Sequence, residues 1–222
     1  MVNYKNLMKV RKTIIEMLND RGYDVSKYIK GNKYKDVSED EVRKEYKQDN
    51  MNLITDSKKI NTFFWDEEGS FSKMTKYLNK IKKNDLEILI LIIGRQSSDN
   101  VLTSNLISNI SQIFVHVEVE IFYIDELVFN ITKHHYVPQH ILLSKKEANI
   151  IYKAYGIDLP LLYKDDIISR YYGAKLNNIF KIIRPDNIYY RKIVNKIWKK
   201  SHMKKITSIT LINSMKNYIK LI

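Results

Sequence analysis

The sequence predicts an α/β domain followed by an α+β domain, and three observations lead to this fold class. The chain has 222 residues, enough for one large domain or two small ones, and its hydrophobic content of 44% is too high for a disordered chain. In residues 1–129, apolar runs of strand length alternate with segments of helical spacing, as in an α/β layer. After residue 130 the pattern changes to an extended segment, two helices and a hairpin. We therefore expect a first domain at residues 1–129, a second at 130–194 and a tail at 195–222.

The first domain opens with an amphipathic helix. Apolar residues recur from Leu7 to Leu18 at spacings of three and four, and Gly22 follows where a helix commonly ends. The next stretch, residues 31–50, is dominated by Lys, Asp, Glu and Tyr. This composition is typical of an exposed loop or a solvated helix, and we expect no chemistry there.

Three strands separated by helices complete the first domain. Residues 60–65 are β-branched and aromatic, which predicts a strand. Residues 86–93 are apolar at almost every position, as in a strand covered on both faces, and residues 115–122 alternate as in a half-exposed strand. Apolar residues at helical spacing predict helices around residues 74–81 and 101–110.

The second domain has clear boundary signals. Pro138 favours an extended segment from Tyr136 to Leu143, because proline keeps the preceding residue out of the helical region. A capping box at residues 144–147 starts a helix that ends at Gly156. A short helix is expected from Asp165 to Tyr172, and residues 179–184 and 188–194 flank a turn, which predicts a β-hairpin.

Composition excludes several function classes. The chain has no cysteine, which removes disulfide frameworks, thiol catalysis, zinc ribbons and iron–sulfur clusters. No run approaches the roughly 18 to 20 apolar residues of a membrane span, and the N-terminus lacks the apolar core of a secretory signal. These features favour an intracellular protein without a membrane span.

The net charge of +13 is unevenly distributed. After Asp186 there are nine basic residues and no acidic one, so residues 1–186 are only mildly basic. In the tail, apolar residues from Ile206 to Ile222 recur at spacings of three and four behind a lysine cluster, which predicts a basic amphipathic helix. Packing on protein is the favoured interpretation, because an exposed apolar stripe is costly; binding to nucleic acid or to an anionic membrane surface stays open.

Six short strings in the second domain occur in the order and approximate spacing of one family. They are NITKH at 130–134, VPQH at 137–140, LSKKE at 143–147, LP at 159–160, SRYYG at 169–173 and KIIRP at 181–185. Together with the opening helix, they make the chain resemble the fifth-largest, shared subunit of eukaryotic-type DNA-directed RNA polymerases, including those of large DNA viruses. The C-terminal half is similar to a small subunit of archaeal RNA polymerases that consists of this module alone.

The resemblance implies a non-catalytic subunit of a multisubunit DNA-dependent RNA polymerase. Its first domain is expected to form a jaw with a restriction-endonuclease-like fold that has no active site, close to downstream duplex DNA and binding it without sequence specificity. Its second domain is expected to dock on the largest subunit beside other polymerase subunits. No cofactor is expected in this chain, since Mg²⁺ belongs to the catalytic subunit. The resemblance implies a nuclear protein if the source is cellular, and a protein of the virion and the cytoplasmic viral factory if it is a large DNA virus.

The chain departs from the family pattern at a few positions. Ser169 stands where the family has alanine, and Asp165 and Asp166 stand where it has Asp-Pro. The segment 176–178 replaces a turn that contains glycine, and asparagine can adopt the positive φ required there. The tail has no counterpart in the family.

The resemblance also supplies candidate site residues. Those expected at the docking surface are Pro138, His140, Arg170, Tyr171, Tyr172, Gly173, Arg184 and Pro185. For the tyrosines, helix closure and core packing are the favoured alternative to direct docking. Those expected near DNA are Arg95, Ser97 and Ser98, which follow a buried strand where backbone N–H groups can meet a phosphate. A plain solvated loop is an equally good interpretation of these three residues.

Two rival functions use other residues. A nuclease would need paired carboxylates for Mg²⁺ and a Glu-x-Lys on the central strand, but the sequence there is Glu87-Ile88-Leu89. A metal site at His134, His135 and His140 is disfavoured, because adjacent histidines in a strand would point to opposite faces. A free-standing nucleic-acid-binding factor that uses the basic tail remains the main alternative, with a nuclease-like enzyme behind it.

Overall fold

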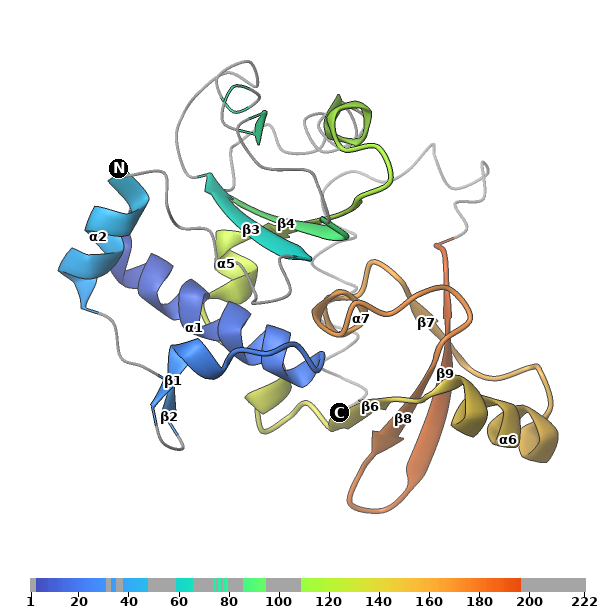
Figure 1. Ribbon diagram of the computed structural model, residues 1–222. Coiled ribbons are helices and arrows are strands. Elements are labelled where there is room, and N and C mark those ends of the chain that lie inside the picture. The colour runs from blue at the N-terminus through green and yellow to red at the C-terminus, as the bar shows by residue number, and fades with distance from the viewer. Residues whose placement is uncertain are drawn as a thin grey trace, which may run out of the picture. The chain divides into compact units, whose positions relative to one another are not determined.

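The computed structural model describes residues 3–30, 33–34, 38–47, 59–65, 74, 76, 78–79, 86–94 and 109–196. The chain separates into two compact units, Met1–Asn130 and Ile131–Ile222. Figure 1 colours the first from blue to yellow-green and the second from yellow to red. Within the part of the chain described, no helix has the length and apolar character needed to cross a membrane.

The first unit opens with helix α1 (Tyr4–Asp20), as the spacing predicts. Asn3 caps it by accepting a hydrogen bond from the Asn6 backbone N–H at 3.1 Å, and Gly22 follows with a positive φ of 84°. The apolar face from Leu7 to Leu18 is fully buried. Burial of this stripe, together with the cap, accounts for a stable helix at the start of the chain.

The chain after α1 contains short elements, and the charged stretch at residues 31–50 includes a helix, which is one of the two predicted alternatives. A 3-10 turn η1 (Ser26–Tyr28) leads into the two-residue strands β1 (Ile29–Lys30) and β2 (Lys33–Tyr34), and helix α2 (Glu39–Lys47) follows. Ser38 and Glu41 form a reciprocal cap at its start. Val42 is fully buried, so one side of this otherwise solvated helix belongs to the core.

A parallel three-stranded sheet forms the centre of the first unit. Its order is β3 (Ile60–Trp65), β4 (Ile88–Ile93) and β5 (Glu118–Tyr123). The short helix α5 (Ile124–Leu127) follows β5 directly. Figure 1 shows α1 on the opposite side of this sheet from the helical segment 109–113.

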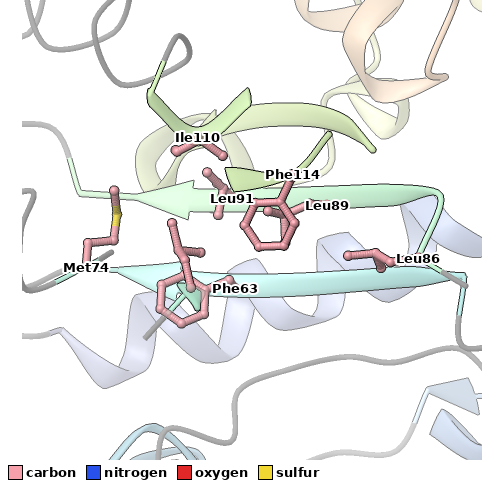
Figure 2. Close-up of a cluster of buried hydrophobic side chains, with 8 residues drawn as sticks. Phe63, Met74, Leu86, Leu89, Leu91, Ile110 and Phe114 are labelled. Atoms are coloured by element: carbon pink, nitrogen blue, oxygen red, sulfur yellow. The ribbon is translucent and has the colours of Figure 1, made fainter. Parts of the chain in front are cut away.

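One face of the sheet carries a continuous apolar cluster. Its buried members are Phe63, Met74, Leu78, Leu86, Leu89, Leu91, Ile110 and Phe114. Figure 2 shows the side chains of β3 and β4 meeting Ile110 and Phe114, which come from the segment before β5. Since a parallel strand buried on both faces must be apolar throughout, the sequence of β4 follows from its central position.

Two predicted strands begin later than expected. The backbone N–H groups of Glu87 and Ile88 both donate to the carbonyl of Lys59, so the ladder starts at Ile88 and not at residue 86. The strand predicted at 115–122 begins at Glu118, because Val115 and His116 form a turn in which His116 has a φ of 68°. The continuous apolar run and the alternation therefore placed the two strands correctly but extended both of them into the residues that precede the ladder.

The described part of the second unit, residues 131–196, is a four-stranded mixed sheet with two α-helices. Its elements in chain order are η2 (Ile131–Lys133), β6 (Gln139–Leu142), α6 (Lys145–Tyr155), β7 (Leu161–Tyr163), α7 (Ile167–Tyr171), β8 (Ile179–Ile183) and β9 (Ile188–Val194). The strand order is β6-β8-β9-β7, and only the β7–β9 pair is parallel. Helix α7 contributes Ile168 to the core beside Phe180 and Ile193.

Helix α6 lies over the other face of this sheet. The rings of Tyr155 and Tyr190 are 5.5 Å apart, and the Lys192 ammonium lies 6.0 Å from the Tyr152 ring. Tyr190 and Lys192 alternate along β9 with Arg191 and the buried Ile193, so they belong to the face opposite the core. Ser144 and Glu147 form the capping box of α6, which confirms that prediction.

The predicted asparagine turn is confirmed as well. Asn177 has a φ of 67°, and its backbone N–H donates to the carbonyl of Ile193 at 2.9 Å. Asparagine tolerates this left-handed conformation better than most residues do.

Candidate docking surface of the second unit

His140 is positioned by the β6 strand and by the proline before it. The residue is 8% exposed, and its ring meets Phe180 edge-on, with the ring centroids 5.8 Å apart. Nδ1 lies 2.7 Å from the carbonyl oxygen of Pro138, and because a carbonyl only accepts, Nδ1 carries the proton in this contact. Pro138 thus fixes the orientation of the imidazole.

Burial is the main influence on the charge of His140. It lowers the pKa of the imidazole, against the hydrogen bond to Pro138 and the nearby carboxylate of Asp166, which both raise it. The positive charges of Arg191 and Arg184 lower it further. The environment therefore favours the neutral ring.

Asp166 begins helix α7. Its carboxylate accepts a hydrogen bond from the Ile168 backbone N–H at 2.9 Å. Burial nevertheless raises the pKa of Asp166, although this hydrogen bond and His140 both act to lower it. The N-terminus of α7 and the start of β6 are therefore electrostatically linked, and no sequence pattern indicated this link.

The Arg170–Gly173 motif closes α7. Tyr171 is only 1% exposed, and the Tyr172 ring meets Phe180 edge-on at 5.6 Å between centroids. Gly173 has a φ of 59°, and its N–H donates to the Arg170 carbonyl at 3.0 Å, so the glycine ends the helix in the left-handed conformation. These contacts support helix closure and core packing for the two tyrosines. A ring as buried as Tyr171 offers no surface to a partner.

Arg184 and Pro185 lie at the end of the β8–β9 hairpin. The Arg184 backbone N–H donates to the Asn187 carbonyl at 2.9 Å, and its guanidinium lies 5.3 Å from the centroid of the Tyr189 ring. Pro185 is exposed, and about half of the surface of Ile188 and Tyr189 is exposed. Tyr189 is opposite Ile182, which is opposite His140, so one row of the sheet leads from the buried histidine to this tip.

The structure thus brings most of the predicted docking residues into one region. His140, Tyr172 and the core around Phe180 form its base, and Arg184 and Pro185 form its exposed end. Ile188 and Tyr189 were not predicted as site residues. The signal available in the sequence was a pair of apolar residues directly after a turn that contains proline.

The other predicted sites have different outcomes. Arg95, Ser97 and Ser98 lie outside the described residues, just after Gly94, whose N–H donates to the Trp65 carbonyl at 2.9 Å. Over the described ranges, no group of three His, Cys, Asp or Glu residues could hold a metal ion.

The prediction for the histidine pair was wrong in one respect. His134 and His135 follow the η2 turn instead of lying in a strand, and their rings stack with centroids 5.0 Å apart. The backbone of a turn does not alternate its side chains between two faces, so the two rings can share one side.

Comparison with known proteins shows two family matches in order along the chain. RNA polymerase Rpb5, N-terminal domain, matches residues 2–86, and RNA polymerase Rpb5, C-terminal domain, matches residues 129–197. The second match covers every described element of the second unit.

Individual relatives agree with these matches. The DNA-directed RNA polymerases I, II, and III subunit of Dictyostelium discoideum is 30% identical over 210 residues, which cover 89% of this chain and 99% of the relative. An RNA polymerase V subunit 5C of Arabidopsis thaliana is 28% identical over 188 residues, covering 82% of this chain and 78% of the relative. The archaeal subunit Rpo5 of Thermofilum pendens is 42% identical over 59 residues, covering 25% of this chain and 74% of the relative. With two domain matches in order and a relative aligned over nearly its full length, this chain belongs to the Rpb5 family of DNA-directed RNA polymerase subunits.

Proposed function

We propose that this chain is a non-catalytic subunit of a multisubunit DNA-dependent RNA polymerase and acts in transcription. The observation that carries the proposal is the ordered match of both Rpb5 domains across the two units. Relatives that align over most of their length are named as polymerase subunits. A free-standing binding factor would not need both domains in this order.

The second unit is the proposed anchor on the largest polymerase subunit. Its match to the archaeal relative reaches 42% identity over 59 residues, against 30% for the Dictyostelium relative over 210 residues. Arg170, Gly173, Arg184 and Pro185 are the proposed contacts. Pro138, His140, Tyr171 and Tyr172 support them from within, because these residues set the position of β6 and the end of α7.

The first unit is the proposed jaw near downstream duplex DNA, with a restriction-endonuclease-like fold. Its parallel β3-β4-β5 sheet supports this assignment. Arg95, Ser97 and Ser98 follow the carboxyl end of β4, where backbone N–H groups of parallel sheets often meet phosphates. Contacts with phosphates alone would be independent of sequence and would weaken as the salt concentration rises.

We propose that other subunits of the complex carry out the catalysis. Glu87, the carboxylate a nuclease would use here, forms an ion pair with Lys59 at the amino ends of β3 and β4. Ligand-binding sites of α/β sheets lie instead at the carboxyl ends of the strands. We propose no cofactor for this chain, Mg²⁺ in the catalytic subunit, and a location that follows the polymerase: the nucleus of a cell, or the virion and cytoplasmic factory of a large DNA virus.

Affinity purification of the tagged full-length chain from its native source tests the proposal. We expect the two largest polymerase subunits to be recovered with it, identified by mass spectrometry. Recovery of the chain as a monomer without them would contradict the subunit assignment.

A pair of charge-reversal variants tests the anchor. Arg184→Glu should reduce recovery of the largest subunit several-fold, because it reverses the charge at the exposed end of the docking surface. Lys146→Glu makes the same charge change at an exposed position of α6 and should leave recovery unchanged. Equal recovery with both variants would move the anchor away from the hairpin tip.

A further inference from the structure

The α6–β7 connection leaves a group of large apolar side chains exposed. We call these residues the β7 patch: Tyr155 is 65% exposed, Ile157 71%, Leu161 54% and Tyr163 47%. They occur within nine residues of each other along the chain. Single exposed apolar residues are ordinary, but such a concentration is typical of a surface that another segment covers.

The β7 patch lies on the side of the sheet that faces away from the candidate docking residues. Leu161 is the register partner of Lys192, whose ammonium lies against the Tyr152 ring of α6, and Tyr163 is the partner of Val194. His140, Phe180 and Ile193 belong to the opposite face, where α7 packs. Docking through the hairpin tip therefore does not itself cover the β7 patch.

The chain leaves the sheet next to this patch. Val194, the last residue of β9, accepts a hydrogen bond from the Lys164 N–H at 2.9 Å, immediately after Tyr163. Residues 197–222 follow and lie outside the described residues. If the apolar repeat from Ile206 to Ile222 forms a helix, it is roughly 25 Å long at about 1.5 Å per residue. This length exceeds that of the three-residue strand β7.

The tail is an addition to the family domain. The C-terminal family match ends at residue 197. The alignment with the Dictyostelium relative spans 99% of that relative but 89% of this chain. The family match thus includes no residue after 197, and 11% of this chain lies outside the alignment with the Dictyostelium relative. The tail nevertheless carries an apolar stripe, formed at helical spacing around Ile212, Met215 and Ile219.

We propose that the tail of this chain folds back on its own second unit and covers the β7 patch with this apolar stripe. Two properties support the chain's own tail as the occupant: it starts beside Tyr163, and the effective concentration of a tethered segment greatly exceeds that of a separate partner. This inference does not depend on the polymerase assignment, because it concerns the free chain.

Disulfide trapping tests the contact directly, since the chain has no cysteine of its own. Leu161→Cys is combined with Ile212→Cys in one full-length variant and with Asn213→Cys in a matched control. These two tail positions are adjacent in sequence, but only Ile212 belongs to the apolar stripe. Under mild oxidation of the dilute monomer, we expect at least a several-fold faster disulfide within the chain for Ile212→Cys.

Two outcomes would overturn the proposal. Equal rates for Ile212→Cys and Asn213→Cys would mean that the tail meets β7 only by random encounter. Disulfides that join two chains, with a rate that falls on dilution, would make a second copy the occupant.

Hydrogen exchange gives an independent readout without cysteines. The double variant Ile212→Asp/Ile219→Asp should increase exchange of the segment 155–163 several-fold, because the stripe can no longer pack. Asn213→Asp/Asn217→Asp adds the same charge off the stripe and should leave exchange as in the wild type. Unchanged exchange in the first variant would contradict a packed tail.

Discussion

Arg21 and Glu120 form a buried ion pair that fixes the end of α1 to β5. The guanidinium donates to both carboxylate oxygens, at 3.1 and 2.7 Å, and the two side chains are only 4% and 14% exposed. Removal of either partner takes this counter-ion away from a charge that stays buried. We expect Arg21→Met or Glu120→Gln to lower the free energy of unfolding by about 3–5 kcal/mol, measured by urea denaturation.

An exposed ion pair in the same unit provides the control. Lys59 and Glu87 also join segments far apart in sequence, but their side chains are 50% and 58% exposed. Solvent screens such a pair, so Glu87→Gln should change stability far less than Glu120→Gln. Equal losses for the two glutamates would show that burial of the Arg21 pair does not decide its strength.

His140 makes the stability of the second unit depend on pH. Burial holds its pKa below the ordinary value of 6.5, so on acidification the unfolded chain takes up a proton before the folded one. Stability should therefore fall as the pH drops through about 6.5. Thermal unfolding at about pH 7.5 and 5.5 should show a smaller loss for His140→Gln than for the wild type.

The surroundings of His140 define the control for this measurement. Asp166, Arg184 and Arg191 are the charged groups that act on it, and all three are retained in the variant. Asp166 has a raised pKa, so its own contribution has the opposite sign: stability falls as the pH rises from 3.8 towards the raised value. An equal loss on acidification in both proteins would assign the pH dependence to other groups.

At the scale of elements, the capping box of α6 is the clearest local signal. Ser144 Oγ accepts from the Glu147 backbone N–H at 3.3 Å, and the Glu147 carboxylate accepts from the Ser144 N–H at 2.8 Å. Ser144→Ala removes the N-cap and should cost about 1 kcal/mol. Hydrogen exchange of residues 145–155 should rise, while α7, which Asp166 caps, should remain protected. Unchanged exchange in α6 would mean that packing alone holds the helix.

Elements that depend on local signals were predictable, and contacts between distant residues were not. Capping, glycine and turn signals located α1, α6, α7 and the β8–β9 hairpin to within two or three residues. The Arg21–Glu120 pair joins residues 99 positions apart, and no spacing rule connects them. Val42 is similar: its burial follows from how α2 packs, whereas its sequence neighbourhood is almost entirely charged.

The candidate docking surface shows the same division. Its residues were found through the family resemblance. The resemblance alone does not distinguish residues that contact the partner subunit from buried residues that hold the surface in place. The burial of Tyr171 and His140 and the exposure of Pro185 and Tyr189 make that distinction, because they depend on the folded sheet.

For the whole molecule, each unit has a core of its own. Leu89 is fully buried in the cluster of the first unit, and Phe180 is fully buried in that of the second. Truncation of a buried Leu or Phe to Ala costs about 2–5 kcal/mol. We expect Leu89→Ala to increase hydrogen exchange in β3–β5 and Phe180→Ala to increase it in β6, β8 and β9. If each variant affected both sets of strands equally, the two cores would not be separate.

The order of strands in the second unit has a consequence for how the protein is made. β7 is synthesised before β8 and β9, but among the described residues its only strand neighbour is β9, the last strand that the structure describes. A nascent chain can form α6 early from local signals, yet β7 must wait until residue 194 has left the ribosome. Until then its apolar side chains have no sheet to join, so the growing chain passes through a stage at which exposed apolar residues can aggregate.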